Sequence, residues 1–404
     1  MEDFEFQNKG RILFGEGKRD EFLQGVKALS DKVLVVCGPH FARSGELGEM
    51  LTAFEEIGIR TWAIADLHQS TIEQARSEER RVGKESTIEQ ARVAWKLCRD
   101  NEIGAVVGVG GATAMDFAKL TAYGACQKED IWLLIATRSS ITTGKRLGLV
   151  TVPTFPSSGS DLDSASEMVE KSTDHAGGLY GAPLIPDFCW LNPAYAKSIP
   201  PEFLAYGVMT SIIQASNSFL NPKQSGYGDM FTSGLIRNEL ANLERAIQKP
   251  GDEAALGELM VSACMNEFGA GTLGKDGADF SVFFIEGIIE YYWDLPYAPS
   301  IVTLFPHWLK SVYSAQPVFR RYFRDAWGVD VDGKTDDQVL ELGLQTIEET
   351  YRKFGLSLTL NELKPQKADP AALRKFIAEP GPCESIYREF TPDDLFELIT
   401  RTAG

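Results

Sequence analysis

Continuous apolar runs alternate with amphipathic segments in the first half of the chain. Residues 31–38 (DKVLVVCG), 103–111 (IGAVVGVGG) and 146–154 (RLGLVTVPT) are rich in β-branched residues and lack polar alternation. Such runs are typical of parallel strands that are buried on both faces. Amphipathic segments at residues 46–58 and 87–104 lie between the first two runs, and each ends at a glycine, as helices often do. The order strand, helix, strand, helix predicts a doubly wound α/β domain.

The second half of the chain follows a helical period instead. Long amphipathic segments after Pro186 predict a series of packed helices, at residues 236–247, 255–269 and 337–355. We therefore predict a Rossmann-like nucleotide-binding domain over residues 1–185 and an all-α domain over residues 186–404.

A charged segment interrupts the first of these domains. The heptapeptide STIEQAR occurs at residues 70–76 and again at residues 86–92, with SEERRVGKE between the two copies. We interpret residues 77–92 as a solvated insertion ahead of a helix; the alternative is a loop that docks a partner.

Composition and charge exclude several classes of partner. The 404 residues include 40 Lys and Arg against 57 Asp and Glu, and the net charge of −17 repels nucleic acid and anionic membranes. The six cysteines contain no CxxC pair, which favours reduced, structural thiols. No apolar run approaches the roughly 18 to 20 residues of a membrane span, and the N-terminus has no signal-peptide pattern. We expect a cytoplasmic protein.

A glycine-rich turn carries the first chemical signal. GVGGATAMDFAK (residues 108–119) directly follows a predicted strand and opens a predicted helix. Glycines let the backbone approach a pyrophosphate, and the helix N-terminus favours its negative charge. Thr113 adds a hydroxyl group, and Asp116 and Lys119 fall in the first turns of the helix. The turn favours nucleotide binding; the alternative is a tight structural turn.

A hydroxyl-rich loop follows the next predicted strand. PTFPSSGSD (residues 153–161) supplies Thr154, Ser157, Ser158 and Ser160. The carboxyl ends of parallel strands meet at one sheet edge, where doubly wound folds bind their ligands. We therefore expect the two loops to lie close together and to contact phosphate or ribose groups.

Five motifs together resemble one known family. FEFQNKGRILFGEG (residues 4–17), GVGGATAMDFAK, VPTFPSSGSD, LNPAYAKSIPPEFLAYG (191–207) and TPDDLFELI (391–399) occur in the order seen in iron-containing, group III alcohol dehydrogenases. The resemblance is closest to the butanol dehydrogenase and NADPH-dependent aldehyde reductase branch, and it spans nearly the whole chain. It implies a dehydroquinate synthase-like fold, with a Rossmann-like domain followed by an all-α domain, and a homodimer.

The resemblance also implies a set of cofactor residues. The family's Gly-Gly-Gly-Ser motif corresponds to residues 110–113, with Ala112 in place of the third glycine. An acidic residue that favours NAD(H) in the family corresponds to Gly38, so we expect NADP(H). The predicted cofactor-binding residues are Gly38, Gly110, Gly111, Ala112, Thr113, Asp116, Thr154, Ser157, Ser158 and Ser160.

The family's metal site is not retained in this sequence. Its ligands are an aspartate, a histidine four residues later and two further histidines, and these positions correspond to Thr210, Gln214, Phe283 and Tyr297. None of the four is a usual ligand for a d-block ion. We therefore predict that no metal is bound and that these residues line a substrate pocket. A replacement site built from Glu286, Glu290, Asp294 and His307 is the alternative.

Three functional hypotheses follow from this pattern. The first is an alcohol dehydrogenase-like oxidoreductase that links NADP(H) to aldehyde or ketone reduction, or to alcohol oxidation, without the metal. Tyr297 would then be the catalytic proton donor to the oxygen of a small-molecule carbonyl substrate; filling of the vacated pocket is the simpler role. The second is a non-catalytic nucleotide-binding pseudoenzyme or partner subunit. The third is a metal-dependent dehydrogenase with substitute ligands.

Overall fold

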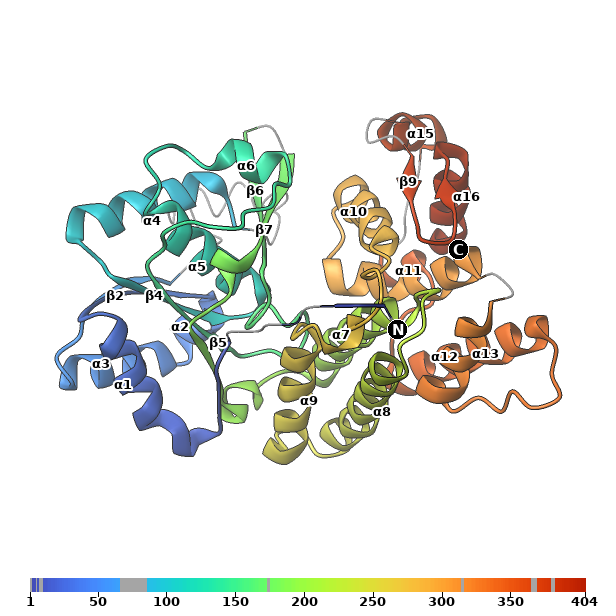
Figure 1. Cartoon of the computed structure of the whole chain (residues 1–404), viewed down its shortest axis with the longest axis horizontal. Coiled ribbons are helices and arrows are strands. Elements are labelled where there is room, and N and C mark those ends of the chain that lie inside the picture. The colour runs from blue at the N-terminus through green and yellow to red at the C-terminus, as the bar shows by residue number, and fades with distance from the viewer. Residues whose placement is uncertain are drawn as a thin grey trace. The chain divides into compact units, whose positions relative to one another are not determined.

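The computed structural model describes residues 2–4, 6, 10–65, 86–172, 175–313, 316–364, 369–378 and 382–404. Two compact units are present (Figure 1). The first, here called the sheet unit, comprises residues 7–198 and 251–268, and the second, the helical unit, comprises residues 1–6, 199–250 and 269–404. Residues 77–85 of the predicted insertion lie outside the described residues, whereas residues 88–92 begin a helix that a Thr87 capping box starts.

The sheet unit confirms the predicted doubly wound fold. The strands of its six-stranded sheet are all parallel and lie in the order β1-β8-β5-β4-β2-β3. The three strands predicted from the sequence are the three central neighbours β5, β4 and β2. In chain order the strands are β1 (Ile12–Phe14), β2 (Lys32–Cys37), β3 (Arg60–Ile64), β4 (Ala105–Gly110), β5 (Gly148–Pro153) and β8 (Phe188–Leu191).

Helices cover both faces of the sheet, which explains why the strands lack polar positions. Phe22 of α1 (Arg19–Leu29) and Phe54 of α3 (Glu46–Glu56) pack with Val33 and Val35 of β2 on one face. On the other face, Trp95 of α4 (Ile88–Asn101) and Phe117 of α5 (Ala112–Gly124) pack with Leu34 and Val36. Successive side chains of one strand therefore enter two different cores.

Several elements of the sheet unit lie beyond the sequence prediction. Strand β8 begins at Phe188, inside the region predicted to be all-α, and pairs with β1 and β5. Helix α9 (Glu253–Asn266) packs on β8 and belongs to this unit, although it follows two helices of the helical unit. The unit also holds an antiparallel hairpin of β6 (Ala165–Glu170) and β7 (His175–Tyr180), together with the short helices α2 (Pro39–Arg43) and α6 (Trp132–Ala136).

The helical unit confirms the predicted helical character of the second half, apart from a short antiparallel pair of strands, β9 (Cys383–Glu384) and β10 (Glu389–Phe390). Helix α7 (Pro201–Phe219) is buried along most of its length and packs against α8 (Gly226–Gln248) and α11 (Tyr297–Val312). The other helices of eight or more residues are α10 (Ser281–Trp293), α12 (Pro317–Trp327), α13 (Asp336–Phe354), α15 (Pro370–Ala378) and α16 (Pro392–Ala403). Within the described part of the chain, no helix has the length and apolar character to cross a membrane.

Candidate nucleotide-binding edge and substituted metal positions

Three loops that were predicted to bind a cofactor meet at one edge of the sheet unit. They follow β2, β4 and β5, which are neighbours in the sheet, and all three strands run in the same direction. The Gly38 amide donates a hydrogen bond to the Val109 carbonyl (3.4 Å), and the Thr154 amide donates to the Gly110 carbonyl (3.0 Å). The structure therefore brings Gly110 and Thr154 together, as the sequence predicted, and places Gly38 beside Val109 at the same edge.

Glycines leave the backbone of this edge open to a ligand. Gly110 has a φ of +144°, and a Cβ there would lie 3.1 Å from the Ala114 Cβ, so a side chain at this position would be strained. A Cβ at Gly111 or at Gly38 would meet no heavy atom within 4 Å. Gly111 is the N-cap of the 13-residue helix α5, whose positive dipole end favours an anion. Such an open, electropositive backbone suits the pyrophosphate of a dinucleotide.

Asp116 and Ser160 both contact the buried ammonium of Lys119. The Lys119 ammonium is fully buried and donates to Ser160 Oγ (2.9 Å), Asp163 Oδ1 (2.5 Å) and the Ala165 carbonyl (2.8 Å). The Ser160 hydroxyl in turn donates to the Asp116 carboxylate. These contacts fasten the loop after β5 to helix α5, and cofactor contact by these two residues stays a prediction.

Burial and charge act in opposition within this network. Burial raises the pKa of Asp116 to about 6, although the Lys119 ammonium opposes the shift. Burial alone would lower the pKa of Lys119, but the Asp163 and Asp116 carboxylates outweigh it and raise that pKa above its usual value. Lys119 therefore stays protonated at neutral pH and holds the network together.

The three histidines among the described residues lie on three different elements and do not form a cluster. His40 is exposed on α2, next to Gly38, with Nε2 3.0 Å from Ser198 Oγ. His175 begins β7, with Nε2 3.2 Å from the Ala136 carbonyl. His307 lies on α11, and burial lowers its pKa. His68 lies outside the described residues.

The four residues that the resemblance aligns with the family's metal ligands lie on three helices of the helical unit. Thr210 is fully buried on α7, where its hydroxyl donates to the Tyr206 carbonyl (2.9 Å). Gln214 follows one turn later, and its buried Oε1 has no hydrogen-bond partner within the described residues. Phe283 on α10 and Tyr297, the first residue of α11, are half-buried. Both α7 and α10 pack on α11.

The side chains at these four positions differ from the ligands that the resemblance implies for the family's metal. None offers a carboxylate, thiol or imidazole group, the donors that a d-block ion needs. Across the described residues, one group of His, Cys, Asp or Glu side chains converges closely enough to hold an ion, and it consists of Asp161, Cys189 and Cys264 in the sheet unit. The ligand atoms of Glu286, Glu290, Asp294 and His307 do not converge in this way in the described structure, and the alternative site stays a prediction.

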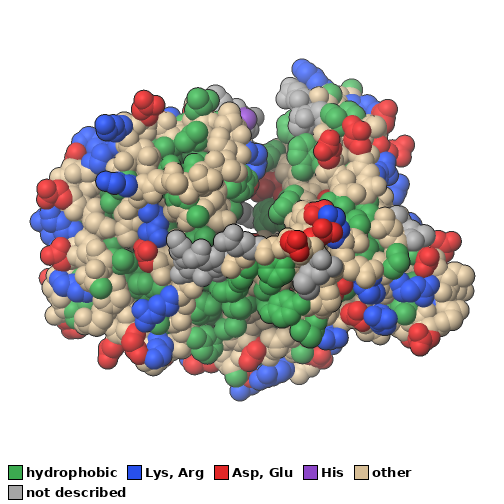
Figure 2. Space-filling model, viewed as in Figure 1, with side chains coloured by type: hydrophobic (Ala, Val, Ile, Leu, Met, Phe, Trp, Pro, Cys, Tyr) green, Lys and Arg blue, Asp and Glu red, His purple; other side chains and the backbone are tan. Residues whose placement is uncertain are grey.

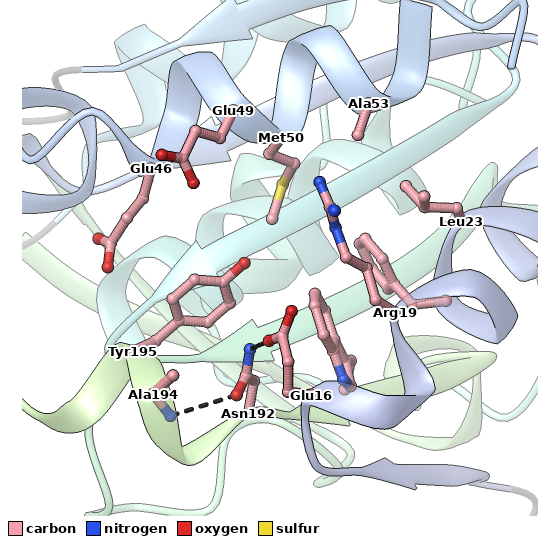
Figure 3. A pocket seen from close by; sticks show the side chains of 12 residues that line it. Glu16, Arg19, Leu23, Glu46, Glu49, Met50, Ala53, Asn192, Ala194 and Tyr195 are labelled. Atoms are coloured by element: carbon pink, nitrogen blue, oxygen red, sulfur yellow. Dashed lines mark hydrogen bonds between the residues drawn. The ribbon is translucent and has the colours of Figure 1, made fainter. Parts of the chain in front are cut away.

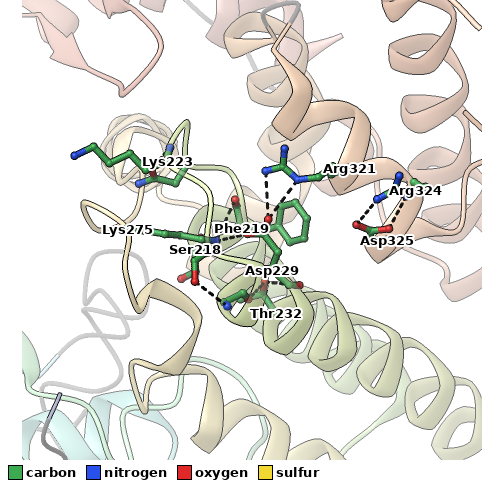
Figure 4. A network of polar contacts seen from close by, with 12 residues as sticks. Ser218, Phe219, Lys223, Asp229, Thr232, Lys275, Arg321, Arg324 and Asp325 are labelled. Atoms are coloured by element: carbon green, nitrogen blue, oxygen red, sulfur yellow. Dashed lines mark hydrogen bonds and ion pairs between the residues drawn. The ribbon is translucent and has the colours of Figure 1, made fainter. Parts of the chain in front are cut away.

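A buried ion-pair network in the helical unit was not predicted from the sequence. Asp229 on α8 lies between Lys275, at 2.7 Å, and Arg321, at 3.2 Å (Figure 4). Lys275 also donates to the Ser218 carbonyl (2.9 Å), and burial lowers its pKa. The three charged residues are far apart in sequence, and no motif marks them. The network ties α8 to α12 and to the segment that precedes α10.

A cavity of about 270 Å³ on the sheet unit has the wrong charge for phosphate groups. The carboxylates of Glu16, Glu46 and Glu49 line it, with Arg19 as the cation among its lining residues (Figure 3). Burial raises the pKa of Tyr195, which also lines the cavity, to about 12, and the nearby glutamates add to the shift. The acidic lining disfavours a dinucleotide here, in contrast to the glycine-lined strand ends.

Comparisons with known proteins agree with this architecture. Residues 9–193, all of them in the sheet unit, match the family model for iron-containing alcohol dehydrogenases. The chain is 23% identical to NADH-dependent butanol dehydrogenase A of Clostridium acetobutylicum over 406 residues, which covers 100% of both chains. It is 21% identical to the NADPH-dependent aldehyde reductase YqhD of Escherichia coli, over 94% of each chain.

Solved structures show the same fold. NADH-dependent butanol dehydrogenase A of Thermotoga maritima superposes with a TM-score of 0.87 at 22% identity, covering 100% of this chain and 99% of that one. The chain therefore has the fold of the iron-containing alcohol dehydrogenases, a Rossmann-like unit with a parallel sheet and a helical unit. Its named relatives are alcohol dehydrogenases and aldehyde reductases.

Proposed function

We propose that this protein is an alcohol dehydrogenase-like oxidoreductase that links NADP(H) to the interconversion of a carbonyl compound and an alcohol, without a catalytic metal. The observation that carries the proposal is the set of adjacent, open glycines at the ends of β2 and β4, next to the N-terminus of α5. Relatives with full-length similarity use nicotinamide cofactors, NADH in one case and NADPH in another, according to their names.

The cofactor fits the strand ends and supplies the hydride that the reaction transfers. In our proposal the backbone of residues 110–113 holds the pyrophosphate, and the hydroxyl groups of Thr154, Ser157 and Ser158 contact phosphate or ribose oxygens. Gly38 presents no carboxylate to the 2′-position, and His40 and Arg43 follow it on α2 with exposed side chains. Basic side chains beside this position favour the 2′-phosphate of NADP(H) over NAD(H).

Loss of the metal requires another way to stabilise charge on the substrate oxygen. A Lewis-acid ion supplies several kcal/mol to such a reaction, and each 1.4 kcal/mol or so is about tenfold in rate. We propose that the Tyr297 phenol donates its proton to the carbonyl oxygen during reduction and regains one from solvent. Thr210, Gln214 and Phe283 line the pocket, and the benzene ring of Phe283 favours a bulky or aromatic substrate.

A small molecule is the proposed substrate, because neither charge nor surface suits a polyanion. The net charge is −17, and Figure 2 shows basic and acidic side chains interspersed over the visible face of the sheet unit. We also propose that the protein is a cytoplasmic homodimer.

The alternative is a nucleotide-binding protein without catalytic activity, acting as a pseudoenzyme or partner subunit. It is favoured by the same substitutions, since the Thr210 hydroxyl is used within its own helix and Phe283 has no polar side-chain atom. Under this alternative the cofactor binds but no turnover follows.

A titration of the purified protein with NADPH, followed by nucleotide fluorescence, tests the proposal. We expect saturable binding that is tighter for NADPH than for NADH, and weaker binding by a Gly111→Val variant, whose side chain occupies the open space above the backbone. Gly48→Val on α3 is the control, because a Cβ there also meets no heavy atom within 4 Å but lies on another part of the unit. Absence of binding at millimolar NADPH would refute both the oxidoreductase and its non-catalytic alternative.

Turnover separates the two candidate functions. If NADPH binds, aldehydes of increasing size are assayed with and without a strong chelator. Reduction that survives the chelator and is lost in Tyr297→Phe, but not in the control Tyr227→Phe at an exposed position, supports the proposed acid. Full activity in Tyr297→Phe removes that role, and binding without turnover of any aldehyde identifies the pseudoenzyme.

A further inference from the structure

Two buried thiols and a buried carboxylate converge inside the sheet unit. Asp161 lies in the loop after β5, Cys189 on β8 and Cys264 on α9, and one ligand atom from each lies within 4.8 Å of the other two. The exposed fraction is 3% for Asp161 and 0% for both cysteines. Neither the predicted cofactor residues nor the substituted metal positions belong to this group.

The surrounding backbone holds the three residues in place. Thr151 of β5 is the register partner of Cys189 on β8, so the two side chains lie on the same face of the sheet. The Thr151 hydroxyl donates to the Asp161 carbonyl (2.6 Å), which fixes the loop above that face. Gly159 brings the same loop against α9, since a Cβ at Gly159 would lie 2.6 Å from the Ala263 carbonyl. The group is thus organised by strand, helix and loop together.

One carboxylate oxygen of this group lacks a hydrogen-bond partner in the described part of the chain. Asp161 Oδ2 has no hydrogen-bond partner within the described residues, although such buried polar atoms are rarely left unpaired. The Cys264 thiol is the group that lies beside the Asp161 carboxylate. A weak thiol donor is a poor partner for a buried carboxylate.

Nearby charges also leave a place for a cation. Asp116, Asp161, Asp163 and Glu267 interact electrostatically in this region with one ammonium, that of Lys119. A divalent ion would relieve the repulsion among these carboxylates.

We propose that Asp161, Cys189 and Cys264 form a structural binding site for a thiophilic divalent ion, with Zn²⁺ as the expected occupant. Two thiolates and one carboxylate are donors that Zn²⁺ accepts, and it prefers four ligands in a tetrahedron. Glu267 is the C-cap residue of α9, three positions after Cys264, and its carboxylate is not among the ligand atoms that already converge. In the proposal its side chain turns toward the ion and supplies the fourth ligand. Binding releases the two thiol protons, so the site gains two negative charges as the dication enters.

The ion would fasten β8, α9 and the loop after β5 to one another. Its role is structural, because it is enclosed by protein and has no open position for a substrate. The proposal does not depend on the proposed oxidoreductase function.

Metal content of the purified full-length chain, produced in zinc-supplemented medium and washed with chelator, tests the site. We expect about one zinc per chain by elemental analysis, falling at least tenfold in the double variant Cys189→Ala, Cys264→Ala. The control is the double variant Cys37→Ala, Cys98→Ala, which removes two other buried cysteines of the same unit and should keep its zinc. Equal zinc in both variants, or none in the unsubstituted protein, would overturn the proposal.

A second measurement uses the unsubstituted protein and does not depend on variants that fold. Unfolding in denaturant should release the zinc to a chromogenic chelator. Two thiols, those of Cys189 and Cys264, should react with a thiol reagent only after the chelator has removed the zinc. In protein produced with Co²⁺, the site should show a thiolate-to-cobalt absorption band in the near ultraviolet. Zinc release with no thiolate-to-cobalt band would place the ion elsewhere and overturn the proposal. Chelator-resistant zinc that is lost from the Cys189 and Cys264 variant while NADPH binding persists separates this site from the proposed function.

Discussion

Glu239 is a buried carboxyl group whose replacement should change how stability depends on pH. It lies on α8 with an exposed fraction of 1%, and its Oε2 has no hydrogen-bond partner within the described residues. Burial raises its pKa from 4.5 to about 8, and a hydrogen bond from Ser211 on α7 opposes the shift only in part. We expect Glu239→Gln to keep the shape of the side chain and to remove its titration.

The sign and size of the effect follow from the two pKa values. Between pH 4.5 and about 8 the folded protein holds a proton that the unfolded chain has released. The free energy of unfolding therefore falls as pH rises through this range, by about 1.4 kcal/mol per pH unit for this group. The accumulated loss is roughly 3 kcal/mol at pH 7 and roughly 5 kcal/mol above pH 8, and below pH 4.5 it vanishes. The glutamine variant avoids this loss.

Urea unfolding of both proteins, followed by tryptophan fluorescence from about pH 5 to about pH 9, measures the difference directly. Taking the variant minus the unsubstituted protein at each pH cancels the titration of other buried acids such as Glu267. We expect the variant to be similar at low pH and more stable by a few kcal/mol at high pH. Glu341→Gln, at an exposed position on α13, is the control and should show no such trend. A difference that stays constant with pH would refute the reasoning.

Three further predictions concern packing and buried charge. Lys119→Met should lower the free energy of unfolding by about 3 kcal/mol, because it leaves the half-buried Asp163 carboxylate without its cation; an unchanged urea midpoint would contradict this. Gly343→Ala on α13 should destabilise by about 1–3 kcal/mol, since its Cβ would lie 2.2 Å from the Phe323 ring. Gly48→Ala on α3, whose Cβ would meet nothing within 4 Å, should instead stabilise by about 0.5–1 kcal/mol. Thermal unfolding midpoints measure both variants: a raised midpoint for Gly343→Ala or a lowered one for Gly48→Ala would contradict the respective expectation.

Local patterns in the sequence determined the central part of the fold. Strands β2, β4 and β5 were predictable because both of their faces are buried, which leaves continuous runs of β-branched residues. The turn at Gly110 and Gly111 was predictable for a related reason, since a positive φ and an open backbone both require glycine. Direction and adjacency of the strands then placed the predicted loops at one edge.

The sequence could not predict which distant segments of the chain contact one another, and only the tertiary structure shows this. Strand β8 has four residues and carries little pattern of its own, so its place between β1 and β5 depends on pairing. Helix α9 gives no sign in its sequence that it packs on the sheet unit rather than with the helices around it.

The same holds for the polar groups of the sheet unit. The sequence identified Asp116 and Ser160 as cofactor candidates, but not that Lys119 binds both Ser160 and Asp163 from inside the unit. It showed six scattered cysteines, and only the fold places Cys189 and Cys264 beside Asp161. Periodicity records which face of an element is buried, whereas the partner on that face is set by chain topology, which no local pattern contains.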